Sequence, residues 1–173
     1  MRDGVRGFRS WVGNLQARTA LVSYRGDSGF PPANLNVIWG PGSLPLVCWS
    51  PWDKPYVQSV GPDRFSLTAI VAGTWDDYIV RWADAAKAFG KPMIVAFANE
   101  MNGEWFPWSG TYYGADTWDK EQANWQGPEQ FKKAYRHVVD RARARGASTI
   151  KWMFQTNKYS YPLDTWNCAP AYY

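Results

Sequence analysis

The chain has 173 residues, of which 46% are hydrophobic and 20% are charged. This length suits one domain with a buried core rather than two, and the apolar fraction excludes a disordered polymer. No apolar run approaches the roughly 18 residues of a membrane span, and no apolar segment follows the charged N-terminus, so we expect neither a span nor a signal peptide here. Aromatic residues make up 17% of the chain, including 12 Trp, which suggests a stacking surface as well as a core.

The net charge is +4, and much of the excess lies in one segment: Lys132, Lys133, Arg136, Arg141, Arg143 and Arg145. A basic helix can bind nucleic acid. It is more often a solvated face whose cations suit the C-terminal end of the helix dipole, and we therefore expect no nucleic-acid partner.

Short apolar runs predict four strands, at residues 20–24, 45–49, 92–98 and 149–154. The middle two are nearly continuous, as in parallel strands that helices cover. A weak amphipathic stretch precedes the first strand at residues 5–15, and a short helix or loop separates the first strand from the second.

Helical spacing of apolar residues predicts two further helices. The first follows the capping residue Thr74, continues to Phe89 and ends at Gly90, and the second begins at Gly127 and ends at Gly146. Helices that alternate with buried strands indicate an α/β sheet or a (β/α) barrel.

A long loop at residues 100–126 follows the third strand, where barrels and open α/β sheets place their sites. It holds seven aromatic residues: Trp105, Phe106, Trp108, Tyr112, Tyr113, Trp118 and Trp125. An apolar strand end beside Glu100 disfavours the charged carboxylate, as a general acid requires. Asn99 can donate a hydrogen bond to a sugar hydroxyl, and Trp rings can stack on sugar faces. These residues together indicate a carbohydrate site.

The run N-E-M-N-G-E-W-F-P-W at residues 99–108 closely resembles the H-E-M-N-G-x-W-F/Y-P-W segment of glycoside hydrolase family 26. Further matches follow in the family's order, with A-Y-R-H-V-V at residues 134–139 and G-A-S-T-I-K-W at residues 146–152. Upstream, P-L-V-C-W-S-P-W at residues 45–52 resembles P-L-I-T-W-E-P-W, and Q-T-N at residues 155–157 resembles S-P-N. The resemblance covers roughly residues 8–173.

The resemblance implies a (β/α)₈ TIM barrel, hydrolysis with retention, and Glu100 as the acid/base at the end of the fourth barrel strand. Two positions depart from the family pattern. Asn99 stands where the family usually has His, although Asn-Glu is the usual pair in related families. Ala96 replaces an Arg, which bears on substrate specificity.

A complete barrel needs roughly 250 residues. We therefore expect one partial catalytic domain over residues 1–173, an internal fragment that covers about strands 2 to 5. The family's nucleophile, at the end of the seventh strand, is then not in this chain, because no Glu follows Glu129. The other acids are expected to cap turns, bind substrate or be solvated: Asp27, Asp53, Glu104 and Asp164. His137, the only histidine, lies mid-helix and is expected to be structural.

The expected function is retaining hydrolysis of a plant-type β-glycan, most specifically β-1,4-mannan. Glu100 is the predicted catalytic residue, and the predicted sugar-binding residues are Asn99, Trp105, Trp108 and Trp49. Neither a metal nor a cofactor is expected, since one His, two distant Cys and scattered acids cannot form a set of metal ligands. The fragment alone is expected to be inactive.

The alternative is a non-catalytic polysaccharide-binding protein with a degenerate barrel. The missing nucleophile and Ala96 favour it, whereas an intact Asn-Glu pair opposes it. The expected partner is a β-linked poly- or oligosaccharide, and an incomplete barrel is expected to self-associate. By analogy with polysaccharide hydrolases, the location is extracellular. Cys48, in an apolar run, is expected to be a buried free thiol, and two cysteines make no disulfide framework.

Overall fold

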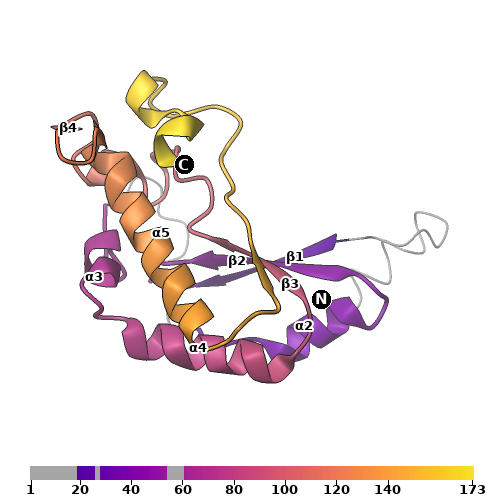
Figure 1. Cartoon of the computed structure of the whole chain (residues 1–173). Coiled ribbons are helices and arrows are strands. Elements are labelled where there is room, and N and C mark those ends of the chain that lie inside the picture. Colours follow the sequence, from indigo (N-terminus) through magenta and orange to yellow (C-terminus); the bar gives the residue numbers. More distant parts are fainter. Residues whose placement is uncertain (1–18, 26–27, 54–60) are drawn as a thin grey trace.

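A parallel sheet of four strands organises the molecule. The computed structural model describes residues 19–25, 28–53 and 61–173; the amphipathic stretch at 5–15 and Asp27 lie outside them. The strands are β1 (Thr19–Arg25), β2 (Leu44–Ser50), β3 (Met93–Phe97) and β6 (Ile150–Trp152), in the order β1-β2-β3-β6 (Figure 1). Each neighbouring pair is parallel. The predicted α/β class is therefore confirmed.

Helices connect these strands, as a parallel sheet requires. They are α2 (Pro32–Trp39), the short α3 (Leu67–Val71), α4 (Asp76–Phe89) and α5 (Gln126–Ala144). In Figure 1, α2 and α4 run below the strands. The two predicted long helices are confirmed, and each is followed by a glycine with positive φ, +67° at Gly90 and +79° at Gly146. The predicted cap is wrong, because α4 begins after Trp75, which makes no side-chain cap bond.

The core lies between the sheet and these helices. Alternation along β2 directs Val47 and Trp49 to the helix side, where both are buried. Trp49 stacks on Trp82 of α4 with 4.3 Å between ring centroids, and its indole N–H donates to the Tyr78 hydroxyl over 3.1 Å. Successive residues point to opposite faces, so Cys48 lies on the face away from the helices.

The long loop after β3 has short elements of its own. It contains a 3-10 turn, η1 (Gly110–Tyr112), and a small antiparallel hairpin of β4 (Trp118–Asp119) and β5 (Asn124–Trp125). The C-terminal turns η2 (Thr165–Asn167) and η3 (Ala169–Tyr172) follow β6, and η3 packs on α5. The loop predicted from sequence is therefore a folded layer beyond the carboxyl ends of β3 and β6.

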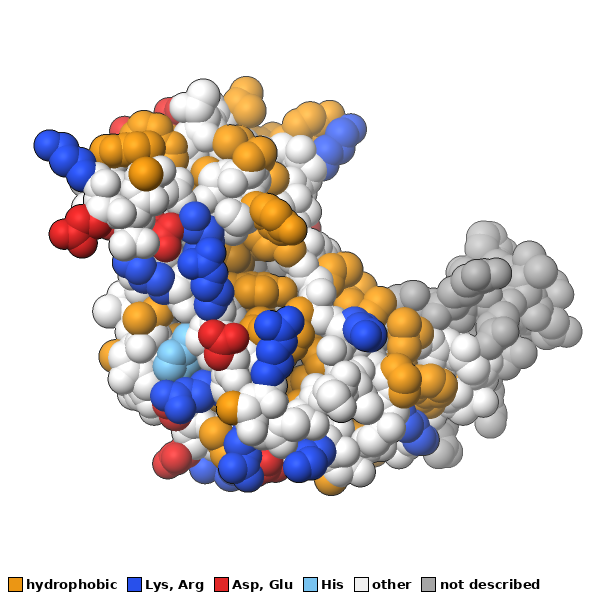
Figure 2. Space-filling view, in the orientation of Figure 1, with side chains coloured by type: hydrophobic (Ala, Val, Ile, Leu, Met, Phe, Trp, Pro, Cys, Tyr) orange, Lys and Arg blue, Asp and Glu red, His pale blue; other side chains and the backbone are white. Residues whose placement is uncertain are grey.

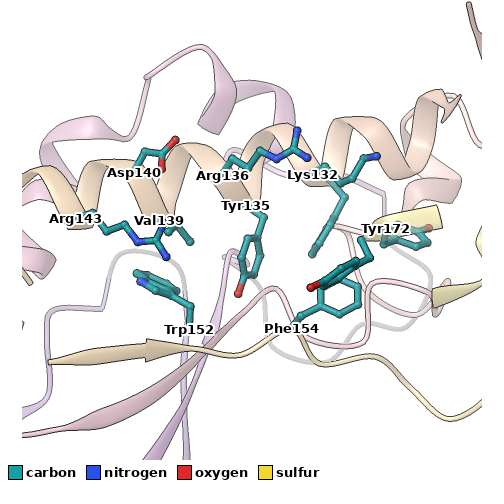
Figure 3. A pocket seen from close by; sticks show the side chains of 11 residues that line it. Lys132, Tyr135, Arg136, Val139, Asp140, Arg143, Trp152, Phe154 and Tyr172 are labelled. Carbon is teal, nitrogen blue, oxygen red and sulfur yellow. The ribbon is translucent and has the colours of Figure 1, made fainter. Parts of the chain in front are cut away.

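An apolar groove runs along α5 beside β6. Its volume is about 370 Å³. Its lining includes Tyr135 and Val139 from α5 and Trp152 from β6, and Figure 3 shows these side chains facing one another. Figure 2 shows hydrophobic side chains in this hollow with Lys and Arg beside it. The groove lies on the helix side of the sheet, because Val95 is in register with the helix-facing Val47 and Trp152 is in register with Val95.

Candidate active site

The backbone turns sharply where β3 ends. Ala98 has φ +48° and Glu100 has φ +55°, in the left-handed region that side chains other than glycine rarely adopt. Each such residue costs about 1–2 kcal/mol. The Glu100 N–H donates to the Gln155 carbonyl over 2.7 Å, and the Ala98 N–H donates to the Trp49 carbonyl over 3.0 Å. Neighbouring strand ends therefore hold the strained turn, as is common at functional sites.

The Glu100 carboxylate has an aromatic partner. The Trp105 indole N–H donates to Glu100 Oε2 over 3.3 Å, and both side chains are half-buried. Tyr161 flanks the Trp105 ring, with 5.6 Å between ring centroids. A Cβ added to Gly103 would lie 2.2 Å from the Trp105 ring, so the indole reaches Glu100 only because position 103 is glycine.

Glu100 also lies near Cys48 on the face of the sheet away from the helices. Burial raises the pKa of the Cys48 thiol, and the negative charge of Glu100 raises it further. The Cys48 thiol contacts Gln155 Oε1 at 4.0 Å. Cys48 is buried and free, as predicted. Side chains from β2 and from the segments that follow β3 and β6 thus meet near the carboxyl ends of these strands: Cys48, Glu100 and Gln155.

Asn99 and Trp108 are joined through the backbone. The Trp108 indole N–H donates to the Asn99 carbonyl over 2.8 Å, and the Asn99 side chain is half-buried. Trp108 is only 1% exposed, and its ring stacks on Phe106 at 4.4 Å between centroids. The prediction that Trp108 stacks on a sugar is therefore wrong, because its ring is covered by protein.

Trp49 needs the same correction. Its side chain is 2% exposed and lies on the helix side of β2, where Trp82 covers one ring face. Strand alternation explains this, because position 49 points away from the face that carries Cys48. Of the predicted sugar platforms, Trp105 alone is partly exposed and in contact with Glu100.

Of the other three described acids singled out from sequence, two have local partners and one is exposed. Asp53 is paired with Arg64 at 3.0 Å. Asp164 accepts from the Thr165 N–H and so caps η2. Glu104 is exposed. These contacts match the turn-capping and solvated roles expected for acids outside the site.

His137 lies mid-helix in α5 and contacts Asp76 at the start of α4. Arg141 pairs with the other oxygen of Asp76 over 2.8 Å. The predicted structural role of His137 is confirmed by this contact between helices.

Sequence reasoning gave no role to Asn102 or Gly103. Asn102 is 1% exposed, and its amide contacts the segment after β6, which no local pattern places beside it. An Asn-Gly pair inside an aromatic loop was the available signal, because Asn and Gly commonly mark turns with special backbone geometry.

Within residues 19–25, 28–53 and 61–173, no three His, Cys, Asp or Glu side chains gather closely enough to hold a metal ion. Across the same residues, no helix combines the length and apolar character needed to cross a bilayer.

Comparison with known proteins decides the family. The sequence model described as "Glycosyl hydrolase family 26" matches residues 68–172, more than half of the chain. The chain belongs to glycosyl hydrolase family 26. A relative, "Endoglucanase H" of Acetivibrio thermocellus, is 31% identical over an alignment of 165 residues. The match covers 86% of this family 26 chain and 16% of the relative.

Solved structures share the fold at lower identity. They include the Bacillus subtilis mannanase BCman (16% identity, TM-score 0.66), GH26A from Muricauda sp. MAR_2010_75 (13%, 0.67), and a β-mannanase from a symbiotic protist of the termite Reticulitermes speratus (14%, 0.66). Each comparison covers 99% of this family 26 chain and 56%, 60% and 55% of the respective relative. The chain thus spans little more than half of these structures.

Proposed function

We propose that this chain carries the acid/base half of a retaining β-glycoside hydrolase, with Glu100 as the catalytic residue. The observation that carries the proposal is the Glu100 carboxylate itself. It follows a buried parallel strand, sits on a left-handed backbone and accepts a hydrogen bond from Trp105. A carboxyl at the carboxyl end of a barrel strand occupies the usual position of a catalytic residue.

The geometry supports different roles for the two oxygens of the Glu100 carboxyl group. Oε2 accepts from the Trp105 indole, which leaves Oε1 as the oxygen proposed to transfer the proton. In the first step Glu100 protonates the glycosidic oxygen as a second carboxylate attacks the anomeric carbon. In the second step Glu100 takes a proton from the water that releases the sugar. Trp105 and Asn99 bind the sugar next to Glu100.

We infer that β-1,4-mannan is the substrate, because two of the structural relatives described above are named as mannanases. The relative called endoglucanase H makes β-glucan the natural comparison substrate. By analogy with polysaccharide hydrolases, the site of action is outside the cell.

The second carboxylate is proposed to come from outside these 173 residues. Retention requires the two carboxyl groups about 5–5.5 Å apart. The sequence has no Glu after residue 129, and Asp53 is already paired with Arg64. We therefore infer that the described sheet corresponds to about strands 2 to 5 of a barrel, and that the chain alone does not hydrolyse glycan.

The test compares two glutamates that lie four residues apart in the full-length protein. Glu100→Gln keeps the shape of the side chain but removes the transferable proton, so kcat on β-mannan should fall by about three orders of magnitude or more. Binding of manno-oligosaccharide should change little, because the loss belongs to the transition state.

The matched control is Glu104→Gln, whose side chain is exposed, and its rate should stay within about twofold of the parent. Near-parental turnover by Glu100→Gln would remove Glu100 from the mechanism. Glycan binding without any reducing-sugar release by the full-length parent would instead favour a non-catalytic binding protein.

A further inference from the structure

The turn that carries Glu100 contacts the segment after β6 through the buried side chain of Asn102. We define the Glu100 turn as residues 98–103 and the terminal segment as residues 155–168. Asn102 lies in the Glu100 turn and is 1% exposed. Its Oδ1 accepts from the Asn157 N–H over 2.8 Å, and its Nδ2 donates to the Asn157 carbonyl over 3.1 Å. The Asn102 side chain therefore pairs with a backbone peptide as a strand would.

The remaining polar groups of Asn102 also contact the terminal segment. Nδ2 donates to Ser160 Oγ over 3.2 Å. The Asn102 carbonyl accepts from the Tyr161 N–H over 2.8 Å and from Asn167 Nδ2 over 3.0 Å. Asn167 is itself fully buried, and its Oδ1 accepts from the Tyr172 hydroxyl over 2.6 Å. Two buried amides thus link the Glu100 turn to the end of the chain.

The contacts between the Glu100 turn and the terminal segment lie on both sides of Glu100, whose backbone is strained. The Glu100 N–H donates to the Gln155 carbonyl, two residues before the Asn157 pairing, and the Glu100 carbonyl accepts from the Gly103 N–H over 3.0 Å. Gly103 in turn forms a parallel bridge with Tyr161. A left-handed conformation at a non-glycine residue persists only when its surroundings determine it. Among the side chains of the Glu100 turn, that of Asn102 makes the most hydrogen bonds to the rest of the protein.

We propose that Asn102 is a positioning residue that holds Glu100 in its left-handed conformation through the terminal segment. This inference rests on the proposed function of Glu100 and deepens it. Asn102 acts through the backbone, and the partners of its side chain are Asn157 and Ser160 rather than the Glu100 carboxylate.

The first test reads the backbone and does not depend on catalysis. In the full-length protein, Asn102→Ala should raise the hydrogen-exchange rate of the Glu100 amide by about tenfold or more, because the Glu100–Gln155 bond then opens locally. The matched control is Asn124→Ala, which removes another amide that joins distant segments, to Glu129 Oε2 and the Ala171 carbonyl. Asn124→Ala should leave exchange at Glu100 unchanged.

A milder variant covers the case in which Asn102→Ala does not fold. Ser160→Ala removes one acceptor of Nδ2 and should raise exchange at Glu100 by a smaller factor than Asn102→Ala. Unchanged exchange in both variants, or an equal rise in Asn124→Ala, would overturn the positioning role.

The second test uses turnover of β-mannan. Asn102→Ala should lower kcat more than it changes KM, and the loss should shrink for a substrate whose leaving group needs no protonation. A loss independent of the leaving group would contradict positioning of an acid. If the parent hydrolyses no β-glycan, the proposed function fails, and the exchange measurement still decides the role of Asn102.

Discussion

Gly103 allows Trp105 to reach Glu100, and this close approach makes a sharp prediction. Gly103→Ala places a Cβ 2.2 Å from the Trp105 ring, so the indole must move and its hydrogen bond to Oε2 is lost. We expect a stability loss of about 1–3 kcal/mol from overpacking, together with a clear fall in kcat/KM on β-mannan.

Gly29→Ala is the control for Gly103→Ala, because nothing lies within 4 Å of its added Cβ. Thermal unfolding and initial rates of the full-length protein measure both effects. A parental rate in Gly103→Ala would show that the Trp105 contact does not serve Glu100.

At the residue scale, the sequence pattern singled out Glu100 as the candidate catalytic residue but did not predict its surroundings. Glu100 could be found because an apolar strand runs into a polar, aromatic segment. Trp49 and Trp108 could not be told from Trp105, because each follows or ends a strand. The difference lies in strand alternation and in packing against Trp82 and Phe106, which only the tertiary fold determines.

Among the elements, the contact between α4 and α5 depends on one carboxylate. Asp76 in the first turn of α4 contacts both His137 and Arg141 of α5, and its side chain is 26% exposed. Asp76→Asn removes the charge from both contacts and should lower the free energy of unfolding by about 1 kcal/mol.

The matched control is Asp77→Asn, which lies in the same first turn but is exposed and so reports the helix-dipole contribution. Thermal unfolding of the full-length protein should give a lower Tm for Asp76→Asn than for Asp77→Asn. Equal melting temperatures would mean that the contact to α5 adds nothing.

The long elements could be predicted from sequence because their periodicity is local. α4 and α5 carry helical spacing and end before glycines, and β2 and β3 are apolar runs. The short α3 and the β4–β5 hairpin were missed, because five-residue and two-residue elements are too short for a periodic signal. β6 is shorter than predicted, since residues 153–154 leave the regular ladder after Trp152.

At the scale of the whole molecule, the sheet formed by the described residues has β1 and β6 as its outer strands and an apolar groove beside β6. In a barrel each strand has two neighbours and each strand pair is covered by a helix. Unpaired strand edges and apolar grooves favour association. The isolated 173-residue chain should therefore self-associate at micromolar concentration, as measured by sedimentation velocity.

The groove makes this prediction specific. Tyr173 lines the groove and is 88% exposed, so Tyr173→Ser should weaken self-association without loss of core packing. The control is Leu163→Ser, which removes an equally exposed apolar side chain (86%) outside the groove lining. A monomeric parent, or equal effects of the two substitutions, would argue against the groove as the contact surface.

The acid/base role of Glu100 is tested most directly by Glu100→Ala in the full-length protein, with dinitrophenyl β-mannoside and sodium azide. This leaving group needs no proton, so the glycosyl-enzyme should form and then wait for a nucleophile that needs no general base. The account predicts slow release of sugar in buffer, acceleration by azide, and mannosyl azide of the β configuration as product. No acceleration by azide, or an α-configured product, would contradict Glu100 as the acid/base of a retaining enzyme.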